Sequence, residues 1–489
     1  MQRRDLSAIV KAYDVRGLVP DQLHAEVART LGAAFAAEIA LPEGAESIVI
    51  GHDMRPSSPE LSEAFAAGVQ SQGVAATLIG LCSTDGLYFA SGALGMPGAM
   101  FTASHNPAAY NGIKLCRAGA RPVGSDSGLT RVREHAQVLL DTGALDSGSQ
   151  HTGAPGSPTR RDLLGEYAAF LRGLVDLSAV RPLTVVVDAA NGMGGHTVPA
   201  VLETAAGLPA LPIEIVPLYF ELDGTFPNHE ANPLDPKNLV DLQAAVRDHG
   251  ADIGLAFDGD ADRCFVVDER GEPVSASAIT ALVAMREIAK EAARGIPADQ
   301  VRIVHNVISS RAVTEFIVRA GAQPVRTRVG HSFIKGEMAK HDAVFGGEHS
   351  AHYYFREFWF ADTGMLAAMH VLAALGEQEG PLSALVAEYA PYASSGEINS
   401  TVADAAGITE RVAAWAGERG LRMDRLDGLT VWHPTDESEP MWWFNLRSSN
   451  TEPLLRLNVE AADPATMERV RDTLLGMIRG AAPAADRGE

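Results

Sequence analysis

The sequence of 489 residues predicts an α/β protein with three similar three-layer domains and a smaller C-terminal α+β domain. Two observations support this prediction. Up to about residue 380, short apolar segments typical of strands alternate with segments of helical periodicity, in three successive units of similar length. From about residue 385 onward, strands of alternating polarity and one closing helix replace that pattern.

The expected domains comprise residues 1–150, 151–257, 258–380 and 381–489. A segment rich in Gly, Ser, Thr and Pro at 141–159 indicates a linker between the first two domains. No clear sequence identity relates the first three domains, so their similarity rests on the repeated order of strands and helices.

The first two domains alternate strands and helices in a regular order. In the first we expect a helix at 24–40, a strand at 47–51, a helix at 57–72 and a strand ending at 98–101. Pro107 and the pair Asn111-Gly112 predict a turn soon after that last strand. In the second we expect a strand at 183–188, a tight turn into a helix at 191–195, a helix at 239–249 and a strand at 252–257.

The third and fourth domains differ in their expected elements. The third has predicted helices at 276–294 and 311–319 and strands at 302–305 and 343–345. The fourth has strands at 429–432 and 442–446, a half-buried strand at 455–460, a helix at 465–479 and a frayed tail at 481–489.

Composition narrows the class of protein. The hydrophobic content of 46% and charged content of 21% are those of a soluble globular chain. A net charge of −22 argues against nucleic acid and anionic membrane as partners. It still permits a small phosphorylated substrate, because a cleft can be locally basic.

The chain shows no sign of export or membrane insertion. No apolar stretch follows the basic start to form a signal peptide, and no apolar run is long enough to span a bilayer. The three cysteines lack metal-type spacing and are expected to be buried, reduced thiols. We therefore expect a cytoplasmic protein.

A reactive serine is predicted where the strand at 98–101 ends. The loop 102–107 reads Thr-Ala-Ser-His-Asn-Pro and places the Ser104 hydroxyl beside the imidazole of His105. Reactive groups usually lie on such loops of a rigid scaffold. The alternative is a Ser/Asn turn that satisfies only its own backbone.

Three carboxylates follow the strand at 252–257. Asp258, Asp260 and Asp262 alternate along the chain, so on an extended segment they would point to one side. Clustered carboxylates repel one another unless a cation such as Mg²⁺ lies between them, and Arg263 beside them could grip a phosphate. An Asx-rich turn or a Ca²⁺ loop is the alternative, but the distal Glu of a Ca²⁺ loop is missing. A haloacid-dehalogenase type of Asp nucleophile would usually have Thr or Val where Ala261 stands.

Two further polar loops offer groups for a sugar phosphate. The loop 346–352 carries Glu348, Ser350 and His352, a mixture suited to sugar hydroxyls; ordinary loop histidines or a zinc site are the alternatives. The loop 447–453 reads Arg-Ser-Ser-Asn-Thr-Glu-Pro and could cradle an anion or form an ordinary turn. Weaker candidates are the segment 330–335 with His331 and the segment 13–17 with Arg16.

Taken together and in this order, the four polar loops resemble the signatures of the α-D-phosphohexomutase family. They span nearly the whole chain. The opening segment 11–17, which reads Lys-Ala-Tyr-Asp-Val-Arg-Gly, resembles the phosphomannomutase/phosphoglucomutase branch. The phosphoglucosamine branch tends to open with a Gly-Thr-Asp-Gly run instead.

The resemblance implies four domains around a central cleft, with the fourth domain as a mobile lid. It implies a phosphate on Ser104 and Mg²⁺ held by that phosphoserine with Asp258, Asp260 and Asp262. It further implies residues around the transferring group (Arg16, His105, Lys114, Arg263 and His352), at the sugar (Glu348, Ser350 and His331) and at the other phosphate (Arg447, Ser449, Asn450 and Thr451). Lys114 or His352 would transfer the proton.

The chain departs from the family pattern at three places. The segment 81–86 replaces a Pro or an aliphatic-Thr-Pro run, the segment 306–311 lacks a Lys found in some bacterial members, and Ala351 replaces a Gly. The second departure leaves one contact of the cleft unassigned.

The resemblance implies that the enzyme interconverts mannose 1-phosphate and mannose 6-phosphate, and glucose phosphates as well. The reaction would pass through a sugar 1,6-bisphosphate, which would also act as activator. Phosphoglucosamine mutase, a Mg²⁺-dependent sugar phosphatase and a non-catalytic sugar-phosphate sensor are the alternatives. We expect a monomer or homodimer whose partners are small hexose phosphates.

Overall fold

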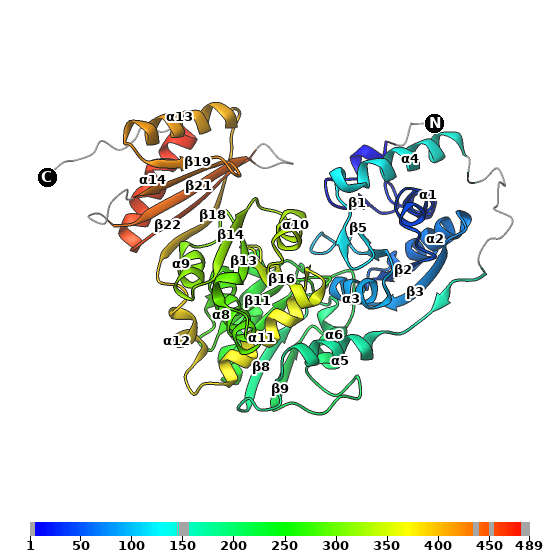
Figure 1. The fold of residues 1–489 in the computed structure, drawn as a ribbon, viewed down its shortest axis with the longest axis horizontal. Coiled ribbons are helices and arrows are strands. Elements are labelled where there is room, and N and C mark those ends of the chain that lie inside the picture. Colours follow the sequence, from blue (N-terminus) through cyan, green and yellow to red (C-terminus); the bar gives the residue numbers. More distant parts are fainter. Residues whose placement is uncertain (1–4, 144, 146–155, 434–439, 449–453, 481–489) are drawn as a thin grey trace. The chain divides into compact units, whose positions relative to one another are not determined.

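The computed structural model describes residues 5–143, 145, 156–433, 440–448 and 454–480 (Figure 1). The chain forms two compact units. The first comprises Met1–Ala276 and Ser350–Leu385, and the second comprises Ser277–His349 and Val386–Glu489. Each unit is described by itself.

The first domain is built on a mixed sheet of seven strands. Its order is β1 (Val15–Leu18), β5 (Tyr110–Arg117), β4 (Gly98–Phe101), β2 (Ser47–His52), β3 (Ala75–Leu81) and β7 (Thr159–Arg160), with β6 (Arg121–Pro122) beside β5. The strands β4, β2, β3 and β7 are parallel, whereas β1 and β5 run antiparallel to their neighbours. Most of the predicted linker lies outside the described residues, but its last residue, Thr159, begins β7.

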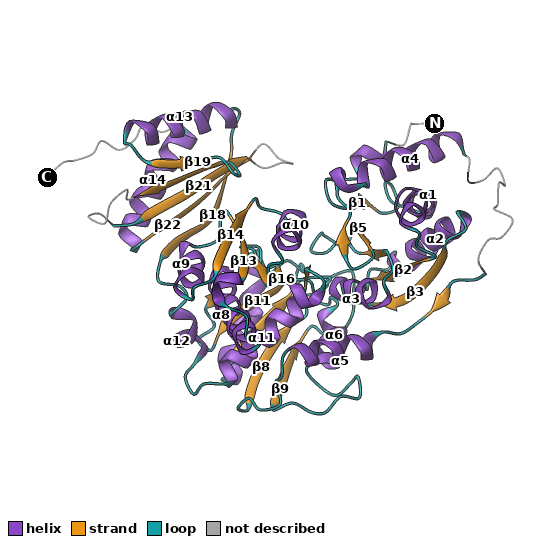
Figure 2. Cartoon of the chain, in the orientation of Figure 1, coloured by secondary structure: helices purple, strands orange, loops and turns teal. Residues whose placement is uncertain are grey.

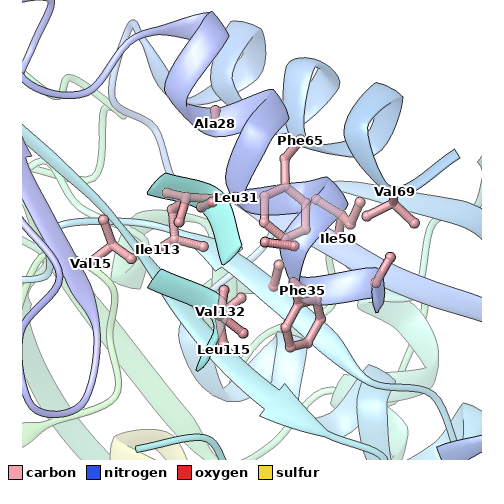
Figure 3. Close-up of a cluster of buried hydrophobic side chains, with 14 of the residues drawn as sticks. Val15, Ala28, Leu31, Phe35, Ile50, Phe65, Val69, Ile113, Leu115 and Val132 are labelled. Atoms are coloured by element: carbon pink, nitrogen blue, oxygen red, sulfur yellow. The ribbon is translucent and has the colours of Figure 1, made fainter. Parts of the chain in front are cut away.

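Four helices cover this sheet: α1 (Ala25–Phe35), α2 (Ser58–Ser71), α3 (Thr84–Leu94) and α4 (Leu129–Thr142). The predicted helix at 24–40 is α1 continued by a π-helical turn at Ala36–Ala40. Side chains of α1, α2 and α4 pack with the strands in one apolar core, which contains Phe35, Phe65 and Val132 (Figure 3). This core fixes β4, and β4 ends directly before the serine loop.

The predicted turn at Asn111-Gly112 is wrong, because both residues belong to the strand β5. Asn111 and Gly112 lie opposite Gly17 and Arg16 of β1. A Cβ on Gly112 would come within 2.3 Å of the carbonyl oxygen of Val15, so the glycine permits close strands rather than a turn.

The second domain contains a sheet of five strands in the order β12 (Pro273–Val274), β11 (Cys264–Asp268), β10 (Ile253–Phe257), β8 (Leu183–Asp188) and β9 (Ile213–Leu218). Its helices are α5 (Leu164–Leu174), α6 (Gly194–Val201) and α7 (Val240–His249). The turn predicted at 191–195 leads into α6, with Asn191 at a positive φ of 57°. The predicted domain boundary at 257/258 lies inside this sheet, because β11 pairs with β10 along its whole length. The prediction that the third domain begins at residue 258 is therefore wrong for β11, which belongs to the second domain.

The third domain contributes elements to both units. In the second unit, β14 (Gln323–Thr327), β13 (Arg302–Asn306) and β15 (Phe345–Gly347) form a parallel sheet with α8 (Ala276–Ala293), α9 (Arg311–Arg319) and α10 (His331–His341). In the first unit, the antiparallel pair β16 (Tyr353–Phe355) and β17 (Ala361–Asp362) precedes α11 (Gly364–Gly376). The short helix α12 (Leu382–Ala387) follows.

The fourth domain is an antiparallel sheet covered on one face. Its order is β18 (Ala393–Thr401), β22 (Leu454–Ala461), β21 (Trp442–Ser448), β20 (Leu429–His433) and β19 (Arg422–Asp424). The helices α13 (Ala405–Glu418) and α14 (Pro464–Arg479) are drawn in purple in Figure 2. They share one apolar core with the sheet. The tail at 481–489 lies outside the described residues.

The predicted layout of three α/β domains and one smaller α+β domain is confirmed. The central cleft stays a prediction. Among the described residues, no helix is long and apolar enough to cross a membrane.

Candidate active site

Ser104 lies on the loop that follows β4, with its side chain almost buried at 4% exposure. Its backbone is left-handed, with φ of 50°, and its N–H donates to the hydroxyl of Thr102 at 2.9 Å. Its hydroxyl donates to Asp258 Oδ2 at 2.9 Å and lies 3.2 Å from Nδ1 of His105. A non-glycine residue at positive φ is held there only by its surroundings, which is common at functional sites.

The three predicted carboxylates converge on one point. One ligand oxygen each from Asp258, Asp260 and Asp262 lies within 4.8 Å of the others, and all three residues are buried. The segment is a turn and not the extended segment predicted, since Ala261 takes a positive φ of 59°. The turn, and not strand alternation, brings the carboxylates together.

Lys114 on β5 neutralises part of this charge. Its ammonium donates to Asp260 Oδ2 at 2.7 Å and also to Asp262 Oδ2. Burial alone would lower the pKa of Lys114, but Asp260 and Asp262 outweigh it and hold the pKa above its usual value. The same ammonium, together with the hydroxyl of Thr84, offsets the burial of Asp260 and keeps the pKa of that carboxyl below its usual value.

The carboxylates retain free oxygen atoms that suit a divalent cation. Oδ1 of Asp260 and Oδ1 of Asp262 are buried and have no hydrogen-bond partner among the described residues. Buried carboxylate oxygens without a partner are costly, and a hard cation that prefers oxygen ligands removes that cost. The residues present therefore fit the predicted metal.

Arg263 and His105 complete the surroundings of Ser104. The guanidinium of Arg263 is buried, donates to Asp258 Oδ2 at 2.8 Å and donates to Nδ1 of His105. Burial, together with the charges of Arg263 and Arg16, lowers the pKa of His105 well below its usual value. His105 is therefore a neutral imidazole at neutral pH, with Nδ1 as acceptor.

Arg16 on β1 contacts the same loop. Its guanidinium donates to the carbonyl oxygen of Ala103 at 2.8 Å and to the side-chain oxygen of Asn106, and it pairs with Asp14 at 2.8 Å. The predicted group of Arg16, His105, Lys114 and Arg263 thus lies around Ser104 and the carboxylates. All belong to the first unit.

The predicted sugar loop divides between the two units. In the second unit, Glu348 is buried and accepts from the backbone N–H of Gly330 at 2.9 Å. In the first unit, Ser350 Oγ lies 2.9 Å from Nδ1 of His352, and Nε2 of His352 is 3.9 Å from Asp262. His352 therefore reaches the edge of the carboxylate cluster.

The remaining candidates belong to the second unit. Arg447 on β21 donates to Glu397 at 2.9 Å. Ser449, Asn450 and Thr451 lie outside the described residues. His331 begins α10, and its side chain also lies outside the description.

Two contacts of the site were not predicted. Thr84, at the start of α3, donates its hydroxyl to Asp260 Oδ2 at 2.6 Å. Arg55, after β2, donates to three carbonyl groups of the serine loop and to that of Tyr110 at the start of β5. The sequence signal for Arg55 is its position directly after a strand, in the motif Asp53-Met54-Arg55. Thr84 lies in the segment 81–86, where the chain departs from the family pattern.

Family models match nearly the whole chain. They are described as phosphoglucomutase/phosphomannomutase, with alpha/beta/alpha domain I at 7–137, domain II at 165–271, domain III at 277–392 and the C-terminal domain at 397–476. The chain belongs to the phosphoglucomutase/phosphomannomutase family. It is thus a phosphohexomutase, an isomerase, which confirms the prediction from the four loops.

Individual relatives agree. The chain is 41% identical to a protein of Xanthomonas campestris pv. campestris named phosphohexose mutases, over 96% of this chain and 99% of the relative. It is 38% identical to a phosphomannomutase of Salmonella typhimurium, over 96% and 98%. Its fold matches the crystal structure of a phosphoglucomutase/phosphomannomutase family protein from Burkholderia thailandensis with a TM-score of 0.82, 30% identity and 98% coverage of each chain.

Proposed function

We propose that this phosphohexomutase interconverts mannose 1-phosphate and mannose 6-phosphate, and accepts glucose phosphates as well. The observation that carries the proposal is the buried hydroxyl of Ser104, which hydrogen-bonds a carboxylate of a three-Asp cluster flanked by Lys114 and Arg263. The names of the similar proteins, several of them phosphomannomutases, support mannose as the sugar.

The reaction runs through a phosphate on Ser104. A hydroxyl of the hexose phosphate attacks phosphorus, the bond between phosphorus and Ser104 Oγ breaks, and the hydroxyl proton leaves to a base. The product of this half is a sugar 1,6-bisphosphate. After it turns over, its other phosphate returns to Ser104, so that the enzyme regains its phosphate and the isomer is released.

Asp258, Asp260 and Asp262, with the phosphate on Ser104, would hold Mg²⁺. The ion would supply positive charge next to the transferring oxygen atoms. Arg263 adds a second, fixed cation at 2.8 Å from Asp258. The hexose 1,6-bisphosphate would serve as activator, because it can restore the phosphate on Ser104.

His352 is the better candidate for the base. Lys114 is held protonated by its two carboxylates, so it can stabilise negative charge but does not accept a proton. His352 lies at the edge of the cluster, and its Nδ1 is fixed by Ser350.

The sugar and the second phosphate would bind at the other loops. Glu348 and Ser350 would contact hydroxyl groups of the sugar. His331 would also bind the sugar, because it directly follows Gly330, whose backbone N–H donates to Glu348. Arg447, Ser449, Asn450 and Thr451 would hold the phosphate that does not react. A cytoplasmic location suits these substrates and the buried free thiols of Cys82, Cys116 and Cys264.

A ³¹P NMR time course tests the proposal. Mannose 1-phosphate, Mg²⁺ and a trace of glucose 1,6-bisphosphate should yield the 6-phosphate, and glucose 1-phosphate should react more slowly. The variant Ser104→Ala should lose turnover yet keep its thermal unfolding temperature, because the substitution removes one hydroxyl. Release of inorganic phosphate alone, or full activity of Ser104→Ala, would contradict the mechanism. Faster conversion of glucosamine 1-phosphate would overturn the mannose preference.

A further inference from the structure

Arg55 gathers the backbone of the serine loop around one guanidinium. Its Nη2 donates to the carbonyl oxygens of Ser104 at 3.0 Å and Asn106 at 2.7 Å. Its Nη1 donates to those of Pro107 at 3.0 Å and Tyr110 at 2.9 Å. Four carbonyl dipoles, three from the serine loop and one from the first residue of β5, therefore converge on a single planar cation. Such convergence would be repulsive without a charged donor at its centre.

The guanidinium is itself fixed from several directions. Arg55 is 1% exposed, and its Nε lies 3.3 Å from Oδ2 of buried Asp53. Asp53 in turn accepts from the hydroxyl of Ser58 at 2.6 Å, at the start of α2. The ring of Phe226, from the second domain, lies 5.1 Å beneath the guanidinium, which adds a cation–π contact.

The carbonyl of Ser104 is the point at which this arrangement meets the reactive group. Ser104 has a left-handed backbone with φ of 50°, and its carbonyl oxygen also packs closely against Gly259 of the metal loop. A residue in that conformation needs external contacts to hold it. The hydrogen bond from Arg55 supplies one on the nucleophile's own peptide group.

We propose that Arg55 is a positioning residue for phosphoryl transfer, which holds Ser104 at the correct place relative to Asp258 through the loop carbonyls. This inference rests on the proposed function. Arg55 contacts neither the Ser104 hydroxyl nor the carboxylates in any hydrogen bond of the described residues, so its effect passes through the backbone. Lys cannot replace it, because one ammonium cannot serve four carbonyls arranged for a planar fork.

The test compares Arg55→Lys with wild type in single-turnover and steady-state experiments. Enzyme phosphorylated by glucose 1,6-bisphosphate is mixed with mannose 1-phosphate, and loss of the phosphate is followed by intact-protein mass. We expect the transfer rate and kcat to fall about 100-fold, as for a nucleophile displaced by about 1 Å. KM should change less than about threefold, since the sugar-binding groups are untouched.

Arg172→Lys is the matched control. Arg172 also donates to backbone carbonyls, those of Val201 and Glu203 at 2.6 Å each and that of Pro209, but in the second domain. Its loss should lower the unfolding temperature and leave kcat unchanged. Equal loss of kcat in both variants would show a general effect of stability and overturn the proposal.

A second pair of measurements covers the case in which Arg55→Lys does not fold. Phe226→Leu removes only the ring beneath the guanidinium and should lower the transfer rate about fivefold with KM unchanged. Added guanidinium should restore part of the rate of Arg55→Ala, at concentrations that leave wild type unaffected. Unchanged transfer in Phe226→Leu, or in folded Arg55→Lys, refutes the role of Arg55. Lack of turnover by wild type would instead refute the proposed function.

Discussion

The three carboxylates next to Ser104 disfavour one another's ionisation. Burial, together with the charges of Asp262 and Asp260, outweighs Arg263 and raises the pKa of Asp258 to about 7. A divalent cation on the two free oxygens of Asp260 and Asp262 would favour the ionised form of all three carboxylates, and a phosphate on Ser104 would then offset the added positive charge.

Gly259 is needed for the contact between the two loops of this site. A Cβ at this position would lie 2.4 Å from the carbonyl oxygen of Ser104, and a backbone atom cannot move away as a side chain can. Gly259→Ala should therefore separate the serine from Asp258 and lower kcat about 100-fold. Steady-state kinetics with mannose 1-phosphate measure the effect.

The control for this substitution is Gly165→Ala, near the start of α5. A Cβ there meets no atom within 4 Å, so alanine should raise helix stability by up to about 1 kcal/mol and leave kcat unchanged. If Gly259→Ala is as active as wild type, the close approach of the two loops has no functional role.

Single residues were predictable where their chemistry is explicit. Ser104 and Asp258 are far apart in the sequence, yet each lies in a polar loop that directly follows a predicted strand. The structure places the hydroxyl of Ser104 2.9 Å from Oδ2 of Asp258. Gly112 was misread because a glycine for close strand contact and a glycine for a turn look alike in sequence. Arg55 was missed because its partners are backbone carbonyls, which no side-chain pattern reveals.

At the scale of elements, α3 connects the site to two other helices. Its first residue, Thr84, holds Asp260, and the next, Asp85, is buried. Asp85 Oδ2 accepts from Tyr167 of α5 at 2.8 Å and from Thr363, the residue before α11, at 2.7 Å. One carboxyl group therefore joins three helices of the first unit.

Asp85 makes the stability of this junction depend on pH. Burial raises the pKa of Asp85 to about 6, from an ordinary 3.8. The folded chain thus binds the proton of Asp85 more tightly than the unfolded chain does. Binding of this proton contributes its full stabilisation below about pH 4, and that stabilisation is lost as the pH rises through about 6. The difference between the two pKa values corresponds to about 3 kcal/mol of folding free energy. Relative to Asp85→Asn, the unfolding temperature of wild type should rise as the pH falls from 7 to about 4.5.

The control is Asp176→Asn. Hydrogen bonds from Ser178 lower the pKa of this exposed carboxyl, so its stabilising effect decreases on acidification. The unfolding temperature of wild type relative to Asp176→Asn should not rise over the same range. A constant difference between wild type and Asp85→Asn would mean that Asp85 is ionised in the folded chain throughout.

Elements with a strong pattern were predicted well, and their grouping less so. The helix at 311–319 and the strand at 183–188 have the predicted bounds, since apolar periodicity and caps agree there. The strand β11 was assigned to the wrong domain, because pairing between β10 and β11 is a long-range property of the sheet. The local sequence pattern predicts that a segment is a strand, but not which other strand it pairs with.

At the scale of the whole molecule, the proposed metal residues all belong to one of the two units. Ser104 comes from the first domain and Asp258, Asp260 and Asp262 from the second, and both domains lie in the first unit. Ion binding would therefore join two domains that the chain connects through 141–159. The four-domain layout was predictable because three units of alternating strands and helices precede a C-terminal part with a different pattern.

Mg²⁺ should consequently stabilise the two units unequally. A ligand at 100 times its Kd adds about 2.7 kcal/mol to the unit that binds it. The full chain need not unfold in one step. In calorimetry, Mg²⁺ should raise the unfolding temperature of the first unit by several degrees and leave that of the second unit unchanged. Asp260→Asn should abolish the shift, whereas Asp223→Asn, at a carboxyl group that accepts hydrogen bonds from Thr225 outside the carboxylate cluster, should retain it. A shift that survives in Asp260→Asn would place the ion elsewhere, because this carboxylate contributes one of the two free buried oxygens.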